Sequence, residues 1–551
     1  MSAALTAVLA GLGAAAWLWL LTRIVLVAAR MHQIEEYEPG RLFAWGCRRA
    51  WLLHRAVLVA AAAPAAVTVA AWIDPSTSPL RALLGGAWLA GGLAAQPGWH
   101  WLPPKKALVF TPRLRRLLAS TAVLALIVAA GVGLAVQLAT PVWLAGLVVV
   151  VASVGATLLG MVLLVAANAV NRPAEAWVRR VFLRQARRRI EQVDPLVIAV
   201  AGSYGKTSTK HILAHFLEQY GPTLATPKSF NTLMGVSRTV NDLLGEEHRT
   251  FIVEMDAYAP GEIASICALV RPSHALLTSV GPQHLERFGT VDRIAAALYE
   301  ALEALPATGF AIVYAGDAAT AALGTRARAA GGEVISYGIE GDSIDLDVVA
   351  GDVQITGSGS TFTWSWPIAG LRHEVTVPLL GRHQVLNVSA ALATVHRLGL
   401  PLEPALRAAT SLAAVDHRLQ PIPTGNAITV IDDSYNANPV GVHNALEVLA
   451  ELDARHRILV TPGLVELGAL EDDENRRYGE HAARVCDHVI VMDARPGRAL
   501  REGLRAGGIP DERVHVVRSL ADATAVIGRI ATAGDAVLFA NDLPDTYLGA
   551  A

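Results

Sequence analysis

One run of residues near the middle of the chain has the composition of a phosphate-binding loop. The β-branched stretch Val197–Ala201 stops at Gly202-Ser203-Tyr204-Gly205-Lys206-Thr207-Ser208, and a helical pattern follows. Glycines let a backbone turn sharply and aim its N–H groups at phosphate oxygens, a helix N-terminus favours anions, and Lys206 adds a point charge. Thr207 is then placed to face a phosphate-bound Mg²⁺. We predict a nucleotide-phosphate site at this loop and expect the loop to be exposed.

The alternative for this run is an ordinary glycine-rich turn, because its spacing is shorter than the general G-x-x-x-x-G-K-[ST] pattern. Lysine usage favours the phosphate site. Of 46 basic residues, the lysines are only Lys105, Lys106, Lys206, Lys210 and Lys228. In a chain that otherwise uses arginine, a lysine in this loop indicates a need for a compact ammonium.

Composition divides the chain near Asn171. The residues before it are largely Ala, Val, Leu, Gly and Trp, and beyond it charged residues return at an ordinary frequency. The net charge of −2 gives no sign of a nucleic-acid-binding surface. The cysteines, Cys47, Cys267 and Cys486, are scattered without metal spacing, as is typical of reduced thiols in a cytosolic setting. We predict a membrane domain over residues 1–172, followed by soluble α/β domains.

Five apolar segments are candidate spans, and most are long enough to cross about 30 Å of hydrocarbon as helices. They are Ala4–Ala28, Trp51–Ile73, a weaker Leu80–Ala95, Leu117–Ala139 and Val142–Val170. A cleaved signal peptide is the alternative for the first segment. It is disfavoured because Arg23 and Arg30 follow the apolar run instead of preceding it.

Arginine and lysine positions set the expected orientation. Basic residues gather between the first two segments, between the third and fourth, and after the fifth, whereas the connections at 74–78 and 140–141 carry none. With five spans, the positive-inside rule places the N-terminus outside and the catalytic domains in the cytoplasm, in a multi-pass protein of the plasma membrane. The following stretch, residues 173–194, includes the basic run Arg179–Arg189. It is either a solvated juxtamembrane linker or a site for anionic membrane lipids.

The second part of the chain alternates short apolar runs with helical patterns. Over residues 195–420 this predicts a P-loop-type α/β domain with a largely parallel sheet, to which residues 333–380 add an antiparallel portion and Gly381–Leu398 a helix. Residues 421–551 predict a separate Rossmann-like domain without the dinucleotide glycine motif. Its strands are expected at 428–431, 458–461, 488–492, 514–517 and 536–539.

From about Val197 to Tyr547 the chain resembles the Mur ligase superfamily, most of all the branch that adds D-alanyl-D-alanine to a muramyl tripeptide. The matching blocks occur in the family's order. They are GSYGKTS at 202–208, NTLMGV at 231–236, EMDAYAPGEI at 254–263, PSHALLTSVGPQHLERFG at 272–289, GRHQVLNVSAALA at 381–393, DHRLQ at 416–420 and DDSYNANP at 432–439.

The resemblance implies an ATP-dependent carbon–nitrogen ligase of peptidoglycan and cell-wall biosynthesis, with ATP and Mg²⁺ as cofactors. A carboxylate would be activated as an acyl phosphate and attacked by an amine. It assigns Lys206, His284 and Arg418 to catalysis and Thr207, Glu254 and His284 to the metal. It assigns the nucleotide to Gly202, Ser203, Gly205, Lys206, Thr207, Ser208, Asn387, Arg418 and Asp433, and the substrate to Asn231, Thr232, Asn436, Asn438 and Glu466.

Several of these residues have simpler explanations. Glu254 could be a strand-end surface carboxylate, and His284 a loop histidine held by hydrogen bonds. Asn387 could be a helix-surface amide and Asp433 a helix N-cap. The asparagines of DDSYNANP suit turn chemistry. The metal assignment is favoured because hydroxyl and carboxylate oxygens beside a phosphate loop are the ligands that Mg²⁺ prefers.

Two departures from the family stand out. Many members carry a carbamylated lysine two residues before a glutamate, which bridges a second Mg²⁺, but here Leu298 precedes Glu300. The soluble domain that grips a UDP-linked sugar also has no counterpart before Val197, where membrane spans are expected instead. The acceptor is then either a lipid-linked muramyl precursor or one held by the loop His32–Arg49. The amine is an amino acid or a dipeptide.

Three further functions compete with this one. A poly-amino-acid synthetase, of the poly-γ-glutamate or cyanophycin kind, belongs to the same superfamily. A catalytically weakened nucleotide-binding membrane scaffold would follow from Leu298, although Lys206, Glu254 and His284 argue against it. ATP-driven transport is disfavoured because the expected spans lack polar residues that would form a path.

Overall fold

The computed structural model describes residues 3–34, 37–49, 51–74, 80–95, 108–139, 141–283, 285–342, 345–356, 359–422, 427–434, 437–465, 467–493 and 496–541. The chain divides into two compact units, Met1–Arg180 and Val181–Ala551. Helix α7 belongs to both, because it runs without interruption from Ala156 to Val193. The basic stretch Arg179–Arg189 is therefore helical.

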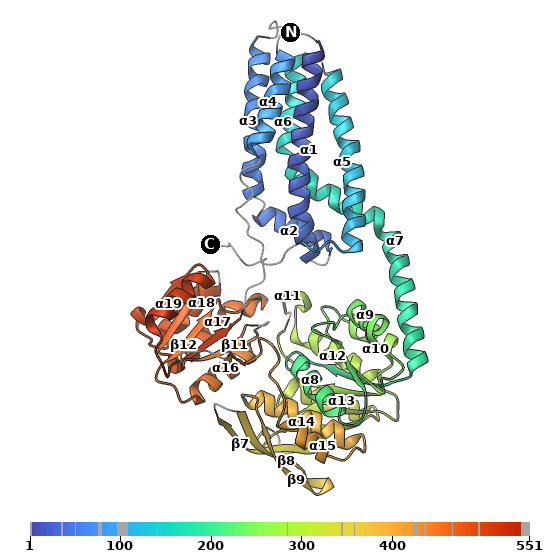
Figure 1. Cartoon of the computed structure of the whole chain (residues 1–551), viewed down its shortest axis with the longest axis vertical. Helices are drawn as coiled ribbons and strands as arrows, with labels where there is room; N and C mark the ends of the chain where they lie inside the picture. The colour runs from blue at the N-terminus through green and yellow to red at the C-terminus, as the bar shows by residue number, and fades with distance from the viewer. Residues whose placement is uncertain are drawn as a thin grey trace. The chain divides into compact units, whose positions relative to one another are not determined.

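The first unit is a bundle of helices. Helix α1 packs on α4, and α3 packs on α4 and α6 (Figure 1). Small residues let these helices approach closely, since a Cβ added to Gly91 of α4 would lie within 2.3 Å of the Ala60 carbonyl oxygen on α3. The helices are α1 (Ala3–Ile34), α2 (Pro39–Arg49), α3 (Trp51–Ile73), α4 (Leu80–Ala94), α5 (Pro112–Leu138) and α6 (Val142–Val154), followed by α7.

The end of α1 and the start of α5 lie at the same end of this bundle. The Gln33 side chain exchanges hydrogen bonds with the Val109 backbone, at 2.9 and 3.1 Å. The Arg113 guanidinium lies 3.9 Å from the centre of the Tyr37 ring, and the Asn168 amide of α7 donates to the Tyr37 carbonyl at 3.3 Å. Arg113 of α5 therefore lies beside Tyr37, which follows α1 in the sequence, at this end of the bundle.

Within the described residues, three helices are long and apolar enough to cross a membrane, at Thr6–Ile34, Pro112–Leu138 and Ala156–Val193. Shorter apolar helices lie at Val57–Ile73, Ala82–Ala94 and Val142–Val154. The last segment, expected as one helix over Val142–Val170, is in fact broken at Gly155 into α6 and α7. The break follows from local composition, because serine and glycine close together in a helix favour a kink, and Ser153 and Gly155 lie at this point.

The second unit begins with a mixed nine-stranded sheet in the order β2-β3-β1-β4-β5-β6-β7-β8-β9. Strands from β2 to β7 run parallel, and β7, β8 and β9 form an antiparallel meander. The strands are β1 (Leu196–Ala201), β2 (Thr223–Ala225), β3 (Thr250–Glu254), β4 (His274–Leu277), β5 (Phe310–Tyr314), β6 (Glu333–Ile339), β7 (Val348–Thr356), β8 (Gly359–Trp366) and β9 (Leu371–Val377).

Strand β6 corrects one expectation. It was placed in the antiparallel portion, but it pairs in parallel with β5, and Phe310 is opposite Glu333. The reason is its connection, because β5 is followed by α13 (Ala318–Ala329), and a helical crossover returns the chain in the same direction. The antiparallel portion therefore begins only at β7.

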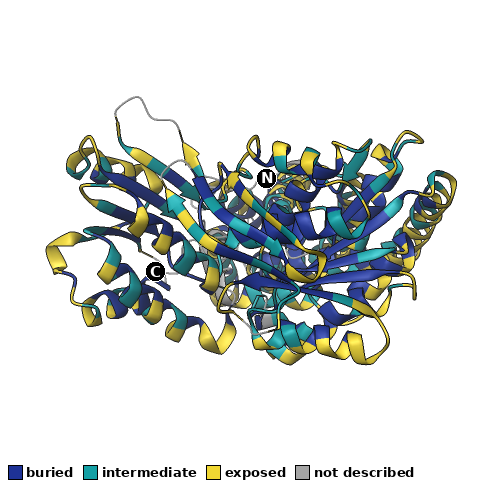
Figure 2. Ribbon diagram, turned by 90° about the horizontal axis from the view of Figure 1, so that it is seen from below, coloured by how far each residue is buried: buried dark blue, intermediate teal, exposed yellow. Residues whose placement is uncertain are grey.

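Helices cover both faces of the central strands, from β3 to β6, which are apolar on both sides, and Figure 2 colours many strand residues as buried. The meander β7–β9 instead alternates buried residues with residues that are more exposed. One face carries α8 (Lys206–Leu217), α14 (Arg382–Arg397) and α15 (Glu403–Ala409). The other carries α9 (Leu233–Leu243), α10 (Glu262–Val270), α12 (Val291–Glu303) and α13, with the short α11 (Leu285–Phe288) beside α12. This arrangement leaves the carboxyl ends of the strands to form a site.

The C-terminal domain has a six-stranded sheet in the order β10-β11-β15-β12-β13-β14, parallel except at β10. Its strands are β10 (Gln420–Ile422), β11 (Thr429–Asp433), β12 (Arg457–Thr461), β13 (His488–Met492), β14 (Val514–Val517) and β15 (Ala536–Ala540). The principal helices are α16 (Pro439–Glu451), α17 (Glu471–Val485), α18 (Pro496–Ala506) and α19 (Leu520–Ile530). The five expected strands are confirmed to within two residues, and β10 was missed because it is three residues long with proline at its centre.

Candidate active site

The glycine-rich loop joins the carboxyl end of β1 to the first residue of α8. Gly202 and Gly205 have φ of 140° and 80°, a region that side chains rarely adopt. A Cβ on Gly205 would also lie 2.8 Å from the Asn387 Oδ1 atom. The loop is held by the segment that follows the neighbouring strand β4, since Ser203 N donates to the Ser279 carbonyl at 2.6 Å and Ser203 Oγ donates to the Gly281 carbonyl at 3.1 Å.

Lys206 lies beneath this loop and is buried. Its Nζ donates to the Gly202 carbonyl at 2.6 Å, to the Ser203 carbonyl at 3.2 Å and to Gln283 Oε1 at 3.2 Å. The Asp256 Oδ2 atom lies 3.5 Å from the same ammonium. The expectation of an exposed loop was therefore wrong for Lys206, because the lysine folds back onto its own loop and the segment after β4 covers it.

A second lysine lies one turn further along α8. Lys210 Nζ is 2.9 Å from Glu254 Oε2 and donates to the Lys228 carbonyl at 2.8 Å. The side chains of Lys210 and Glu254 are both buried, and Glu254 is the last residue of β3. Burial by itself would raise the pKa of Glu254, but the charge and hydrogen bond of Lys210, with smaller effects of Lys206 and Asn231, hold that pKa below its ordinary value. Glu254 is thus a buried carboxylate and not the strand-end surface residue that was the alternative explanation.

Oxygen and amide groups converge around Glu254. Thr207 Oγ1 donates to Glu254 Oε1 at 3.2 Å, and Asn231 Nδ2 donates to the same oxygen at 3.1 Å. His284, predicted to join them, lies outside the described residues. In the described part of the chain, no three histidine, cysteine or acidic side chains converge as a metal site. A cation here would therefore take much of its coordination from a bound phosphate, which is how Mg²⁺ is usually held.

A small hollow opens beside the loop. Its walls include Gly202 and Ser203 of the loop, Asp256 after β3, Gln283 after β4, and Leu298 of α12. Leu298, predicted to stand where relatives carry a lysine, thus lines this hollow beside the glycine-rich loop and is itself buried. Its partner in the sequence pattern, Glu300, caps the start of α10 by accepting from Gly261 N at 2.6 Å and from Ala264 N at 2.8 Å.

The C-terminal domain presents Asp433 at the end of β11. Its Oδ1 accepts from Leu419 N at 3.1 Å, and burial raises its pKa to about 7 although the charge of Arg418 opposes the shift. Arg418 and Asp433, both predicted to bind the nucleotide, are therefore close enough to interact electrostatically. Asp433 does not cap α16, since that helix is capped by Asn438.

Comparison with known proteins decides the family. The family described as the Mur ligase middle domain matches residues 200–395, and the Mur ligase glutamate ligase domain matches residues 417–541. UDP-N-acetylmuramoyl-tripeptide–D-alanyl-D-alanine ligase of Escherichia coli (strain K12) is 32% identical over 360 residues, which cover 64% of this chain and 72% of that protein. The chain belongs to the Mur ligase family.

Other relatives agree with this assignment. The ligase of the same name from Mycobacterium tuberculosis is 34% identical over 56% of this chain and 60% of its own length. A crystal structure of MurF from Acinetobacter baumannii aligns with a TM-score of 0.59 and 28% identity, covering 66% of this chain and 77% of that one. MurF from Thermotoga maritima, solved in complex with ADP, has the same fold with a TM-score of 0.58 at 24% identity, over 66% and 80% of the two chains.

This Mur ligase is accordingly an ATP-dependent amide-bond ligase of the MurF-like kind. The phosphate loop, Glu254, Leu298 and Asn387 all lie within the middle-domain match, and Arg418 and Asp433 lie within the C-terminal match. Neither match includes the helical bundle, which ends before residue 200.

The predicted residues have different positions relative to the loop. Asn387 is buried against Gly205 on the inner side of the loop, where Oδ1 accepts from Thr209 Oγ1 at 3.0 Å and Nδ2 donates to Gln384 Oε1 at 3.1 Å. Ser208 is buried on α8. Thr232 caps α9 and Asn438 caps α16 through their side-chain oxygens, so each has a structural role. Asn436 and Glu466 lie outside the described residues.

Sequence reasoning missed three residues of the site, namely Lys210, Asp256 and Gln283. The only advance signal for Lys210 was the scarcity of lysine. Asp256 and Gln283 each follow the end of a central parallel strand by a few residues, which is where polar side chains of α/β sites gather. Position relative to the strand ends could therefore have identified both.

Proposed function

We propose that this Mur ligase is a membrane-bound, ATP-dependent peptide ligase that works through an acyl phosphate on a peptidoglycan-related precursor. One observation carries the proposal. Lys206, Thr207 and Glu254 are assembled at the carboxyl ends of β1 and β3, where loop amides, an ammonium and hard oxygen ligands can receive a nucleotide and its metal.

Lys206 would leave the Gly202 and Ser203 carbonyls and turn toward the β- and γ-phosphates. Thr207, Glu254 and His284 would hold Mg²⁺. Thr207 Oγ1 and Glu254 Oε1 lie 3.2 Å apart, and Mg²⁺ prefers such hydroxyl and carboxylate oxygens. When bound, Mg²⁺ supplies positive charge to the phosphate oxygens. Asp433 and Arg418 would meet the ribose and phosphates. Asn387 Nδ2 donates one hydrogen to Gln384 Oε1, and its second hydrogen would be the one offered to the adenine.

The chemistry would proceed in two displacements. A carboxylate oxygen of the acceptor attacks the γ-phosphorus, the bond to the β–γ bridging oxygen breaks, and ADP leaves. The amine nitrogen then attacks the carbonyl carbon, the carbon–oxygen bond breaks, and phosphate leaves as the nitrogen loses a proton. Lys206 neutralises charge on the γ-phosphoryl oxygens, which is the main contribution of a protein to the catalysis of phosphoryl transfer.

The proposed acceptor is a muramyl peptide, and the amine an amino acid or a dipeptide. The E. coli relative is named for a UDP-linked muramoyl-tripeptide and D-alanyl-D-alanine. We propose that the acceptor here is lipid-linked, because the matched domains are preceded by a helical bundle that would hold them at a membrane. Asn231, 3.1 Å from Glu254, is the predicted substrate residue best placed beside the phosphates, while Thr232, Asn436, Asn438 and Glu466 stay as predictions.

Membrane insertion is supported by the outer surface of the bundle. Only 11% of the most apolar stretch of helix α5 is buried, and its outward residues are large hydrophobics, among them Leu126, Ile127 and Leu138 at 60%, 62% and 71% exposure. Contact with water would be unfavourable for such an apolar surface, whereas contact with lipid chains would be favourable. Membrane lipids are therefore the proposed partner of this surface.

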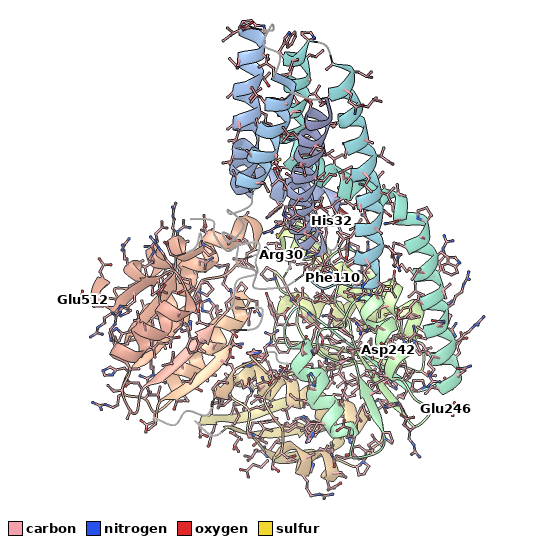
Figure 3. The ribbon with its side chains drawn as sticks, turned by 45° about the horizontal axis from the view of Figure 1, so that its top comes forward. Arg30, His32, Phe110, Asp242, Glu246 and Glu512 are labelled. Carbon is pink, nitrogen blue, oxygen red and sulfur yellow. The ribbon has the colours of Figure 1, made fainter. Side chains whose placement is uncertain are left out.

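The proposed orientation is that of the plasma membrane with the N-terminus outside and the catalytic domains in the cytoplasm. Arg30, Arg113 and Arg116 lie at one end of the bundle, the end that Figure 3 marks with Arg30, His32 and Phe110. Reporter fusions before Ala4 and after Asn171 test this. We expect opposite sides, and reporters on the same side would exclude an odd number of spans.

Oxygen-18 transfer tests the reaction itself. An acceptor labelled in its carboxylate should pass one labelled oxygen to the released phosphate for every amide formed. Unlabelled phosphate with amide formation would exclude the acyl phosphate. Repeated addition of one amino acid to a growing product would favour the poly-amino-acid synthetase, and nucleotide binding without turnover would favour the weakened scaffold that Leu298 suggests.

A further inference from the structure

One histidine of the helical bundle is buried without a partner for either ring nitrogen. His32 lies near the end of α1 and is 0% exposed. In the described part of the chain, neither its Nδ1 nor its Nε2 atom has a hydrogen-bond partner. Buried polar side chains nearly always find such partners, and a neutral imidazole has one donor and one acceptor to satisfy. The described residues therefore leave the hydrogen-bonding capacity of His32 unused.

Two arginines and a tyrosine lie at the same end of the bundle as this histidine. The His32 ring meets the Tyr37 ring edge-on, with 5.4 Å between the ring centres. The Arg113 guanidinium lies 3.9 Å from the centre of the same Tyr37 ring, so the histidine and the arginine pack on one side chain. Arg30 precedes His32 by two residues, and its Nε atom is buried without a hydrogen-bond partner (Figure 3).

The unsatisfied groups at this end are mainly N–H donors, which select an anion. Within the described residues, neither Arg30 nor Arg113 forms an ion pair, and the carboxylate of Glu175 on α7 is bonded to Arg116 at 2.8 Å. Asn171, one turn before Glu175, also has its Nδ2 atom buried without an acceptor. A phosphate group accepts several such hydrogen bonds at once, and those from arginine are strengthened by charge.

The depth of these residues indicates a lipid as the source of the anion. His32 and Arg30 lie near the end of one candidate span, and Arg113 is the second residue of another, α5. The ends of membrane spans lie at the level of the lipid headgroups, where basic groups between helices bind headgroup phosphates. Val109 and Phe110, which are 60% and 54% exposed, precede α5 and offer apolar contact to a lipid chain.

An alternative explanation is that long side chains at the ends of spans extend into the headgroup region without binding anything specific. That explanation is sufficient for Arg113, whose side chain is exposed. It does not explain His32, because an imidazole that is fully buried with both nitrogens unpartnered gains nothing from the headgroup region. A ligand that reaches this histidine is required.

We propose that Arg30, His32 and Arg113 bind the phosphate group of a membrane lipid at this end of the bundle. The proposal rests on the proposed function, in which the acceptor is carried on a lipid, and it gives the phosphate of that lipid a binding site in the helical domain. A polyprenyl phosphate and a phospholipid share this chemistry, and we expect the polyprenyl phosphate to bind more tightly.

Lipid binding can be measured without turnover. Full-length protein in detergent is incubated with undecaprenyl phosphate, with dioleoylphosphatidylglycerol, or with undecaprenol, which has the polyprenyl tail and no phosphate. Bound lipid is counted by native mass spectrometry. Wild type should bind undecaprenyl phosphate and not undecaprenol. Arg113→Gln and His32→Gln should weaken this binding by roughly tenfold or more, as expected for loss of a hydrogen bond to a charged group.

The matched control is Arg115→Gln, which removes the same charge two residues further along α5 and should leave binding unchanged. The melting temperature of each variant reports its folding. Equal binding of phosphatidylglycerol, with the same loss in Arg113→Gln, would support the site and assign it to bulk phospholipid.

Three results would overturn the proposal. They are equal binding of undecaprenol, equal binding by Arg113→Gln and Arg115→Gln, and displacement of the lipid by an equal concentration of inorganic pyrophosphate, which would indicate a site for free anions. Membrane fractionation separates this failure from that of the proposed function. Protein that sediments with membranes but binds no lipid phosphate would contradict only this inference, whereas protein that stays in the soluble fraction would contradict the proposed membrane-bound ligase.

Discussion

Lys210 Nζ lies 2.9 Å from Glu254 Oε2, and the two side chains are 0% and 2% exposed. The pair joins the second turn of α8 to the end of β3 beneath the phosphate loop. The two lysines of α8 that are one helical turn apart therefore have different partners: Lys206 donates to the carbonyls of its own loop, whereas Lys210 pairs with Glu254 in the interior.

We predict that Lys210→Met destabilises the ligase by about 3–5 kcal/mol, because Glu254 would be left buried without its counter-ion. Thermal unfolding of the detergent-solubilised protein measures this. Adding Glu254→Gln should recover much of the loss. Lys228→Met is the control, because Lys228 contributes its backbone carbonyl and its side chain is exposed. Equal melting temperatures for Lys210→Met and Lys228→Met would contradict a structural role for the buried pair.

Lys206→Ala should lower ATP turnover by at least about 100-fold, as expected for loss of a group that stabilises developing charge. The protein should stay folded, because Asp256 is partly exposed and can be solvated. Lys206→Arg should fail as well, since a planar guanidinium cannot replace a compact ammonium under the loop. Phosphate release measures both variants, and wild-type rates in either would refute the phosphate-loop assignment.

Turnover should be insensitive to bicarbonate, because Leu298 has no nitrogen to carbamylate. Mg²⁺ dependence should fit at most one site beyond the cation that travels with ATP. Leu298→Lys should create a bicarbonate response if the hollow accepts a carbamate, and an uncarbamylated lysine there should reduce stability through desolvation. The rate is measured against Mg²⁺ and bicarbonate for both proteins. Strong bicarbonate activation of wild type would mean that Leu298 is not the equivalent position.

Asp433 should make the nucleotide-free protein less stable as the pH rises. Burial raises its pKa from 3.8 to about 7, so between these values the unfolded chain has released a proton that the folded chain still holds. Stability attributable to Asp433 therefore falls across that window and is lowest above pH 7. Asp433→Asn should match wild type near pH 4 and melt a few degrees higher at pH 8.

Asp432→Asn provides a control of opposite sign. Although burial would raise the pKa of Asp432, hydrogen bonds from Ser434 and His417 hold it below its ordinary value, so its carboxylate stabilises the fold at neutral pH. Melting curves from pH 4 to 8 compare the two variants. A pH-independent difference between Asp433→Asn and wild type would show that Asp433 titrates normally.

Much of the catalytic architecture could be predicted because it depends on local patterns. Strands β13 and β14 occupy the expected residues, since each is a short apolar run bounded by polar turns. Lys206, Thr207, Glu254 and Asn231 converge because they follow neighbouring strands at the same edge of a parallel sheet.

The remainder depended on contacts distant in sequence. Lys210 and Glu254 are 44 positions apart in the sequence, one in a helix and one in a strand, and no local pattern predicts that they pair. Asn387 faces inward because α14 packs on α8, which turns its amide toward Thr209. The direction of β6 likewise follows from its connection to β5, which the alternating pattern of its residues does not fix.

We propose that this chain couples ATP cleavage to amide formation on a membrane-bound precursor. The most direct measurement is ADP release and amide formation by the full-length solubilised protein. Muramyl tripeptide, carried on UDP or on an undecaprenyl lipid, is supplied with D-alanyl-D-alanine or single amino acids, and Lys206→Ala is the blank. We predict one ADP per amide, released only when acceptor and amine are both present, and faster with the lipid-linked acceptor. ADP release that is indifferent to acceptor and amine, or no amide with any pair, would contradict the account.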